Sequence, residues 1–251
     1  MKASDEDRVS PDQFARVAGS PGETPRFAGL LRVLWPFLLL TFAAGYLVRA
    51  AWPVPALGTT EIGAAFLALA GVLAWSVTAG RHRLESFLKG ARGEESVARA
   101  LSFLPAPHRV YHGLPSADGL LGGGDYDHVV VGPAGIFLVE TKSWYGRITV
   151  RDGAVLYDGN QPDRPPLEQV KDAAGALRRE LRERVYRKLD VQPVLCFAQG
   201  YVQDGRAGTS GVLICTVHTL TDVLQEPPDV PLSQGIQEQV AYYLDHRTRS
   251  S

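Results

Sequence analysis

Two carboxylates and a lysine, Asp127, Glu140 and Lys142, are the side chains whose types and spacing best suit chemistry. They lie within residues 125–148, DYDHVVVGPAGIFLVETKSWYGRI, where two apolar runs flank the sequence GPAG. Proline at the second position and glycine at the fourth favour a tight turn. The β-branched residues on either side favour strands. This stretch therefore predicts an antiparallel hairpin.

The predicted hairpin brings the three charged side chains together. With proline and alanine at the centre of the turn, Asp127 lies opposite Glu140 at about 5 Å, where like charges destabilise a sheet. Lys142 is two residues beyond Glu140 and therefore on the same face. A hard divalent cation bound by both carboxylates would remove the repulsion, and the lysine would then act on a water or a phosphoryl oxygen. The alternative is a strand-end charge cluster, in which Asp127 caps a turn and Lys142 pairs with Glu140 or Asp125.

Composition places few limits on the function. The 26 basic and 27 acidic residues give a formal net charge of −1, so a nucleic-acid-binding surface would have to be local. Cys196 and Cys215 lie in apolar, strand-like runs, which favours buried reduced thiols over a disulfide. The six histidines form no zinc-binding pattern, and we discount the pair His108 and His112 because no cysteine or acidic partner is nearby.

Two uncharged apolar stretches, residues 33–48 and 62–80, precede the charged hairpin. A membrane helix needs about 20 mostly apolar residues, so we expect a transmembrane helical hairpin over residues 29–82 that contacts the lipid bilayer. Residues 1–28 lack apolar periodicity and are expected to form a flexible cytoplasmic tail. Basic residues flank the outer ends of both stretches, which predicts a location in the cell membrane with both termini in the cytoplasm. The alternative is a pair of buried core helices.

Residues 83–251 are expected to form an α/β domain with one mixed sheet. Apolar residues at helical spacing predict a first helix from about residue 83 to residue 104, with Gly90 and Gly93 as brief interruptions. A longer helix is predicted over residues 167–189. The remaining predicted elements are strands at residues 108–113, 147–150, 154–157, 191–198 and 211–217, and helices at residues 219–225 and 234–246.

Three motifs of this domain resemble the nuclease-related domain family (NERD), a branch of the PD-(D/E)xK, restriction-endonuclease-like superfamily. They are KGARGEESV at residues 89–97, YDHVVVGPAGIFLVETKSWYGRI at residues 126–148, and LEQV at residues 167–170. The combination is more specific than an aspartate followed by ExK alone. The resemblance implies a restriction-endonuclease-like mixed sheet flanked by helices.

The same resemblance implies a metal centre. Asp127 and Glu140 would be the direct ligands, and the carbonyl oxygen of Thr141 a third. Lys142 would position the attacking water. The implied metal is Mg²⁺, with Mn²⁺ as the alternative.

Two further side chains enter by resemblance alone. Glu94 would hold a metal-bound water or a second metal, with the adjacent Glu95 as a substitute; the alternative is a carboxylate favoured by the dipole near a helix start. Gln169 would reach the site from the long helix, whereas the residues alone favour an ordinary solvent-facing glutamine.

The function implied is metal-dependent hydrolysis of phosphodiester bonds, in DNA by family resemblance and with RNA as an alternative substrate. The competing hypothesis is a membrane-tethered module that binds nucleic acid or acts as a scaffold without turnover. The sequence predicts no oligomeric state.

Overall fold

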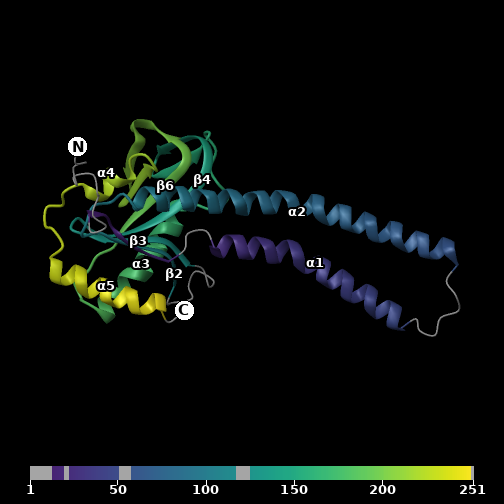
Figure 1. Ribbon diagram of the computed structural model, residues 1–251. Coiled ribbons are helices and arrows are strands. Elements are labelled where there is room, and N and C mark those ends of the chain that lie inside the picture. Colours follow the sequence, from purple (N-terminus) through teal and green to yellow (C-terminus); the bar gives the residue numbers. More distant parts are fainter. Residues whose placement is uncertain (1–12, 20–22, 51–57, 117–124, 250–251) are drawn as a thin grey trace, which may run out of the picture. The chain divides into compact units, whose positions relative to one another are not determined.

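The structure is a computed structural model that describes residues 13–19, 23–50, 58–116 and 125–249 (Figure 1). It forms two compact units, one of Glu23–Ala91 and one of Met1–Gly22 with Arg92–Ser251. In chain order the elements are β1 (Arg16–Ala18), α1 (Glu23–Ala50), α2 (Thr59–Leu101), β2 (Arg109–Pro115), β3 (Asp125–Gly132), β4 (Gly135–Arg151), β5 (Ala154–Tyr157), α3 (Pro166–Arg184), β6 (Gln192–Val202), the 3-10 turn η3 (Gln203–Gly205), β7 (Arg206–Thr209), β8 (Val212–Thr216), α4 (Leu220–Gln225) and α5 (Gln234–Arg249).

The second unit contains a mixed sheet of eight strands in the order β1-β2-β3-β4-β6-β8-β7, with β5 paired to β4. Strands β2, β3 and β4 are antiparallel neighbours, whereas β4, β6 and β8 run parallel. The parallel connection from β4 to β6 contains α3, as such crossovers require. The α/β fold with one mixed sheet and flanking helices is confirmed.

The hairpin of β3 and β4 has the predicted register. Gly132 pairs with Gly135, and the pairing continues to His128 opposite Val139. His128 directly follows Asp127 in β3, and Val139 directly precedes Glu140 in β4. Strand β4 then runs on without a break to Arg151, which turns back into β5. One long strand, β4, therefore carries Glu140 and Lys142 and also pairs with β5.

Each face of the sheet carries its own apolar core, because side chains alternate along a strand. Val129 and Val131 of β3 pack with residues of α3 and α5, such as Leu177 and Val240. Val130 of β3 belongs to the core on the other face, with the end of α2 and with α4. Helices α3 and α5 thus cover one face, and α2 and α4 cover the other.

Several element boundaries differ from the predictions. Helix α2 is continuous through both glycines that were expected to interrupt it. Helix α3 ends at Arg184 rather than residue 189; the next residue, Val185, has non-helical backbone angles while its N–H still bonds Leu181. Strand β7 was not predicted.

The stretch at residues 1–28 that was expected to be a flexible tail contains two regular elements among its described residues. Arg16–Ala18 forms strand β1 and pairs in parallel with β2, and helix α1 begins at Glu23. A short strand is hard to recognise from sequence because its backbone hydrogen bonds to a distant partner define it. Residues 1–12 and 20–22 lie outside the described residues.

Both apolar stretches are helical, in α1 and in the first part of α2. A bilayer crossing needs about 20 consecutive apolar residues. Among the residues that the structure describes, no helix combines sufficient length with sufficient apolarity to cross a membrane. The expected transmembrane hairpin is therefore not supported.

Candidate active site

Strand alternation places Asp127, Glu140 and Lys142 on the face of the sheet that α3 covers. Asp127 has the same parity along β3 as Val129, and Glu140 and Lys142 the same parity along β4 as Leu138; both apolar residues belong to the α3 core. The first turn of α3 carries Gln169. The sheet and one helix therefore bring together four of the predicted site residues.

Three of these side chains form a closed hydrogen-bonded triangle. The Lys142 ammonium donates to Glu140 Oε1 at 2.8 Å and to Gln169 Oε1 at 2.9 Å. The Gln169 amide donates to the same Glu140 oxygen at 2.7 Å. The Lys142 and Glu140 side chains are largely buried, with 18% and 10% exposed, respectively, whereas Gln169 is exposed. Gln169 thus reaches Lys142 and Glu140 from α3, and its role in the site stays a prediction.

Asp127 lies beside this triangle, in surroundings that disfavour its charged form. Its Oδ2 accepts a hydrogen bond from the Thr141 backbone N–H at 2.7 Å. Burial raises the pKa of Asp127 well above its ordinary value, and the charges of Glu140 and Glu94 raise it further, against the opposing effects of the Thr141 bond and Lys142. The predicted repulsion between the two hairpin carboxylates is present, and Glu94 adds to it from α2.

Glu94 approaches Asp127 from α2, on the other face of the sheet. The preceding residue, Gly93, allows this approach. A Cβ built on Gly93 would lie 1.8 Å from Ser143 Oγ on β4, so only a residue without a side chain lets α2 come this close to the sheet. Ser143 points to the α2 face, as its parity along β4 requires. The sequence predicts a helix interruption at Gly93, whereas in the structure the helix continues and the glycine allows this close packing. Its position immediately before Glu94 in the first motif was the available signal.

We expect Gly93→Ala to destabilise the protein by about 1–3 kcal/mol, the usual cost of forcing a methyl group into a packed site. The matched control is Gly90→Ala on the same helix, where a Cβ meets nothing within 4 Å. That substitution should be neutral or stabilising by up to about 1 kcal/mol, because alanine favours helix. Denaturant unfolding measures both. Equal stability of the two variants would contradict the close approach of α2 to β4.

The donor chemistry of the site suits a hard cation. In the described part of the chain, no three His, Cys, Asp or Glu side chains are grouped so as to hold a metal ion by themselves. A site for Mg²⁺ needs only one or two carboxylates, because water and substrate oxygens complete the shell. Asp127 Oδ1 and Glu140 Oε2 accept no hydrogen bond from the described residues, so each can still bind a ligand. A divalent cation between them would also offset the repulsion that raises the Asp127 pKa.

The comparison with protein families gives this arrangement a context. Residues 89–198 match the nuclease-related domain, NERD. The match covers less than half of the chain, and it contains the end of α2, the hairpin, α3 and the first part of β6. No curated protein and no solved structure matched the chain.

The region that matches the nuclease-related domain thus contains all six residues singled out from the sequence. Asp127, Glu140, Lys142 and Gln169 are brought together, and Glu94 acts on Asp127 through its charge. The sixth, Thr141, contacts the site through its backbone N–H, so its carbonyl as a metal ligand stays a prediction.

Trp144, which follows Ser143 in β4, has a packing role. The Trp144 ring lies 5.6 Å from Tyr157 and 5.5 Å from Phe197, measured between ring centroids. It is partly buried against the core on the α3 face. The tryptophan therefore supports the strand that carries Glu140 and Lys142.

Proposed function

We propose that the NERD domain is a metal-dependent nuclease that hydrolyses phosphodiester bonds, with DNA as its substrate. The observation that carries this proposal is the pair of carboxylates, Asp127 and Glu140, held next to the buried ammonium of Lys142. Placing two carboxylates together at the end of an apolar hairpin costs stability. A divalent cation between them would remove this repulsion and could at the same time bind a phosphodiester oxygen.

Mg²⁺ or Mn²⁺ would be held by Asp127, Glu140 and the Thr141 carbonyl, and it would neutralise the scissile phosphate and lower the pKa of the attacking water. The protein supplies the positioning. Lys142 has three N–H donors, and Glu140 and Gln169 accept two of them. The remaining donor is available to orient the attacking water or to stabilise negative charge that develops on a phosphoryl oxygen.

Gln169 and Glu94 complete the set from the two helices. Gln169 fixes Lys142 and Glu140 by hydrogen bonds and so holds the ammonium beside the carboxylates. Glu94 brings a further carboxylate close enough to raise the Asp127 pKa. A carboxylate in that place would accept a proton or a hydrogen bond from a bound water.

The test is cleavage of labelled plasmid DNA by the purified full-length chain, with RNA of equal length in parallel. We expect products with Mg²⁺ or Mn²⁺, none with a chelator, and none from the double variant Asp127→Asn/Glu140→Gln prepared in the same way. Equal cleavage by that variant would identify a contaminating nuclease. Salt-sensitive binding of DNA without products in either metal would overturn the proposal in favour of a binding module without turnover.

A further inference from the structure

Past the candidate active site, strands β4 and β6 carry two exposed tyrosines and an exposed arginine. Tyr145 and Arg147 lie on β4, and Tyr201 of β6 is the direct partner of Arg147 in the parallel pairing. Tyr145 is 51% exposed and Tyr201 is 61% exposed. The next residues along the two strands, Ile148 and Val202, are buried in the core that α3 covers. Because side chains alternate along a strand, Arg147 and Tyr201 project from the opposite face of the sheet.

The two tyrosines are diagonal neighbours across this strand pair. Tyr145 pairs with Gln199, and Tyr201 is two residues further along β6. A strand spacing of about 4.8 Å and an advance of two residues of about 3.3 Å each separate their Cα atoms by roughly 8 Å. Exposed aromatic rings stack on nucleic-acid bases with little regard to sequence, because every base has a flat face. We call Tyr145, Arg147 and Tyr201 together the tyrosine surface.

Arg147 gives the tyrosine surface a positive charge. Its guanidinium makes no hydrogen bond or ion pair with the residues that the structure describes. Asp158, the carboxylate that bonds this part of β4, accepts the Arg147 backbone N–H at 2.7 Å and lies against Gly146. It therefore does not occupy the arginine side chain. An exposed guanidinium next to two exposed rings is complementary to nucleic acid, which offers phosphates and flat bases in alternation.

An open strand edge connects the tyrosine surface with the candidate active site. Among the described residues, β3 pairs with β4 only as far as Val139, and β5 pairs with β4 only from Ile148 onward. Lys142 and Tyr145 lie in the stretch between, three residues or roughly 10 Å apart. A nucleic acid bound at both would pass around this edge from one face of the sheet to the other. A single strand is flexible enough for this turn, whereas a duplex is stiff over about 150 base pairs.

We propose that the tyrosine surface binds single-stranded nucleic acid, with bases stacked on Tyr145 and Tyr201 and a backbone phosphate at Arg147. The inference rests on the proposed function for the class of ligand and adds its form: the substrate reaches Lys142 as a single strand. Exposure, the spacing of the rings, the unpaired charge and the open edge of β4 support it.

The test measures binding in the presence of EDTA, so that no metal-dependent cleavage takes place. The purified full-length chain is titrated into a fluorescein-labelled DNA single strand of about 12 nucleotides, within the usual range of such sites, and into the duplex of the same sequence. Fluorescence anisotropy should show saturable binding of the single strand and weaker binding of the duplex. Tyr145→Ala/Tyr201→Ala should weaken single-strand binding by about tenfold or more, the effect of losing two stacked bases. Tyr145→Phe/Tyr201→Phe keeps both rings and should bind like wild type.

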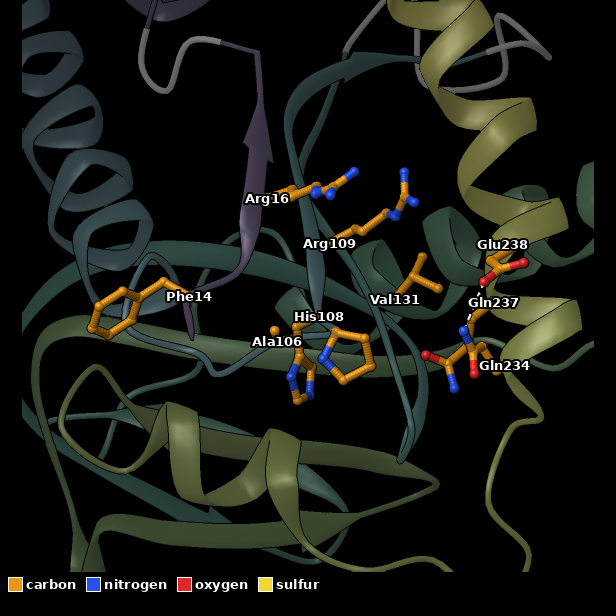
Figure 2. A pocket seen from close by; sticks show the side chains of 10 residues that line it. Phe14, Arg16, Ala106, His108, Arg109, Val131, Gln234, Gln237 and Glu238 are labelled. Atoms are coloured by element: carbon orange, nitrogen blue, oxygen red, sulfur yellow. Dashed lines mark hydrogen bonds between the residues drawn. The ribbon is translucent and has the colours of Figure 1, made fainter. Parts of the chain in front are cut away.

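An arginine pair provides the control for charge. Arg147→Gln should weaken binding and lower the slope of log K against log salt by about 0.7, the value for one phosphate of a single strand. Arg16→Gln removes the same charge from an exposed position on β1, three strands from β4. Arg16 lies in the wall of a separate cavity of about 480 Å³, together with Arg109 and Glu238, as Figure 2 shows. This variant should leave the affinity and the salt slope unchanged.

Three results would overturn the inference: no saturable binding of the single strand, a duplex bound as tightly, or undiminished binding by Tyr145→Ala/Tyr201→Ala. A wild-type dimer that this variant converts to a monomer, with unchanged DNA binding, would assign the tyrosines to contact with a second copy of the chain. The nuclease proposal fails separately. Tyrosine-dependent binding without cleavage in Mg²⁺ or Mn²⁺ would reject nuclease activity alone, and cleavage with normal binding by the alanine variant would reject the tyrosine surface alone.

Discussion

Replacing Lys142 by methionine is expected to lower the rate of DNA cleavage by about 10²-fold or more, the usual cost of removing a group that stabilises charge or moves a proton in the transition state. Its ammonium is the cation that the structure holds against Glu140 and Gln169. Methionine has a similar length and no charge, so the space stays filled. Single-turnover cleavage with saturating Mg²⁺ measures the effect on the chemical step.

The matched control is Lys188→Met, which removes an exposed lysine beyond the end of α3. It should leave the cleavage rate unchanged. Cation binding, followed by calorimetry, should persist in Lys142→Met because both carboxylates remain. A cleavage rate in Lys142→Met within a few-fold of wild type would exclude Lys142 from the mechanism, even if the domain proves to be a nuclease.

The second expected result is that Asp127→Asn stabilises the protein at neutral pH in the absence of divalent cations, by on the order of 1 kcal/mol. Burial, Glu140 and Glu94 all disfavour the charged form of Asp127 and raise its pKa. Asparagine removes the charge and keeps an oxygen that can accept the Thr141 N–H. The same substitution should abolish cleavage, so stability and activity would change in opposite directions.

The contribution of Asp127 to the free energy of unfolding should decrease as the pH rises. Because the folded-state pKa of Asp127 is raised, the folded protein binds its proton more tightly than the unfolded chain does. The associated stability is complete below the ordinary aspartate pKa, near 4, and is lost as the pH rises through the raised value. The difference between wild type and Asp127→Asn should therefore be absent below about pH 4 and should grow as the pH rises above it. Denaturant unfolding at a series of pH values measures it.

Divalent cations should reverse the order of stability. A cation that binds only the folded state raises the free energy of unfolding, and it should do so for wild type but not for Asp127→Asn. Glu140→Gln, which leaves Asp127 charged, provides a matched comparison. If Mg²⁺ and Mn²⁺ stabilise all three proteins equally, the cation binds elsewhere and the carboxylates are a strand-end charge cluster.

Much of the site follows from local sequence. The hairpin register depends on a two-residue turn and on strand alternation, so Asp127 and Glu140 could be placed together from the positions of Pro133 and Gly135. The position of Lys142 on the same face followed from a spacing of two. These predictions succeeded because each involves residues that are neighbours along one strand or across one turn.

The contributions from other elements could not be obtained in this way. Residue spacing favoured an ordinary solvent-facing Gln169; the residue is exposed, but the packing of α3 against β4 brings its side chain to Lys142. Gly93 was interpreted as a helix interruption, because the need for a glycine arises only when Ser143 of a distant strand packs against it. Arg16 was assigned to a tail, and only its pairing with Arg109 of β2 places it in the sheet.

The sequence by itself thus determined the hairpin, its paired carboxylates and the α/β class, since short-range turn geometry and side-chain alternation decide all three. The tertiary structure alone decided which helices supply Gln169 and Glu94, how closely α2 approaches β4, and where β1 joins the sheet. These depend on contacts between segments far apart in the chain. Such contacts are set by the shape of the packed core and leave no periodic signal in the sequence.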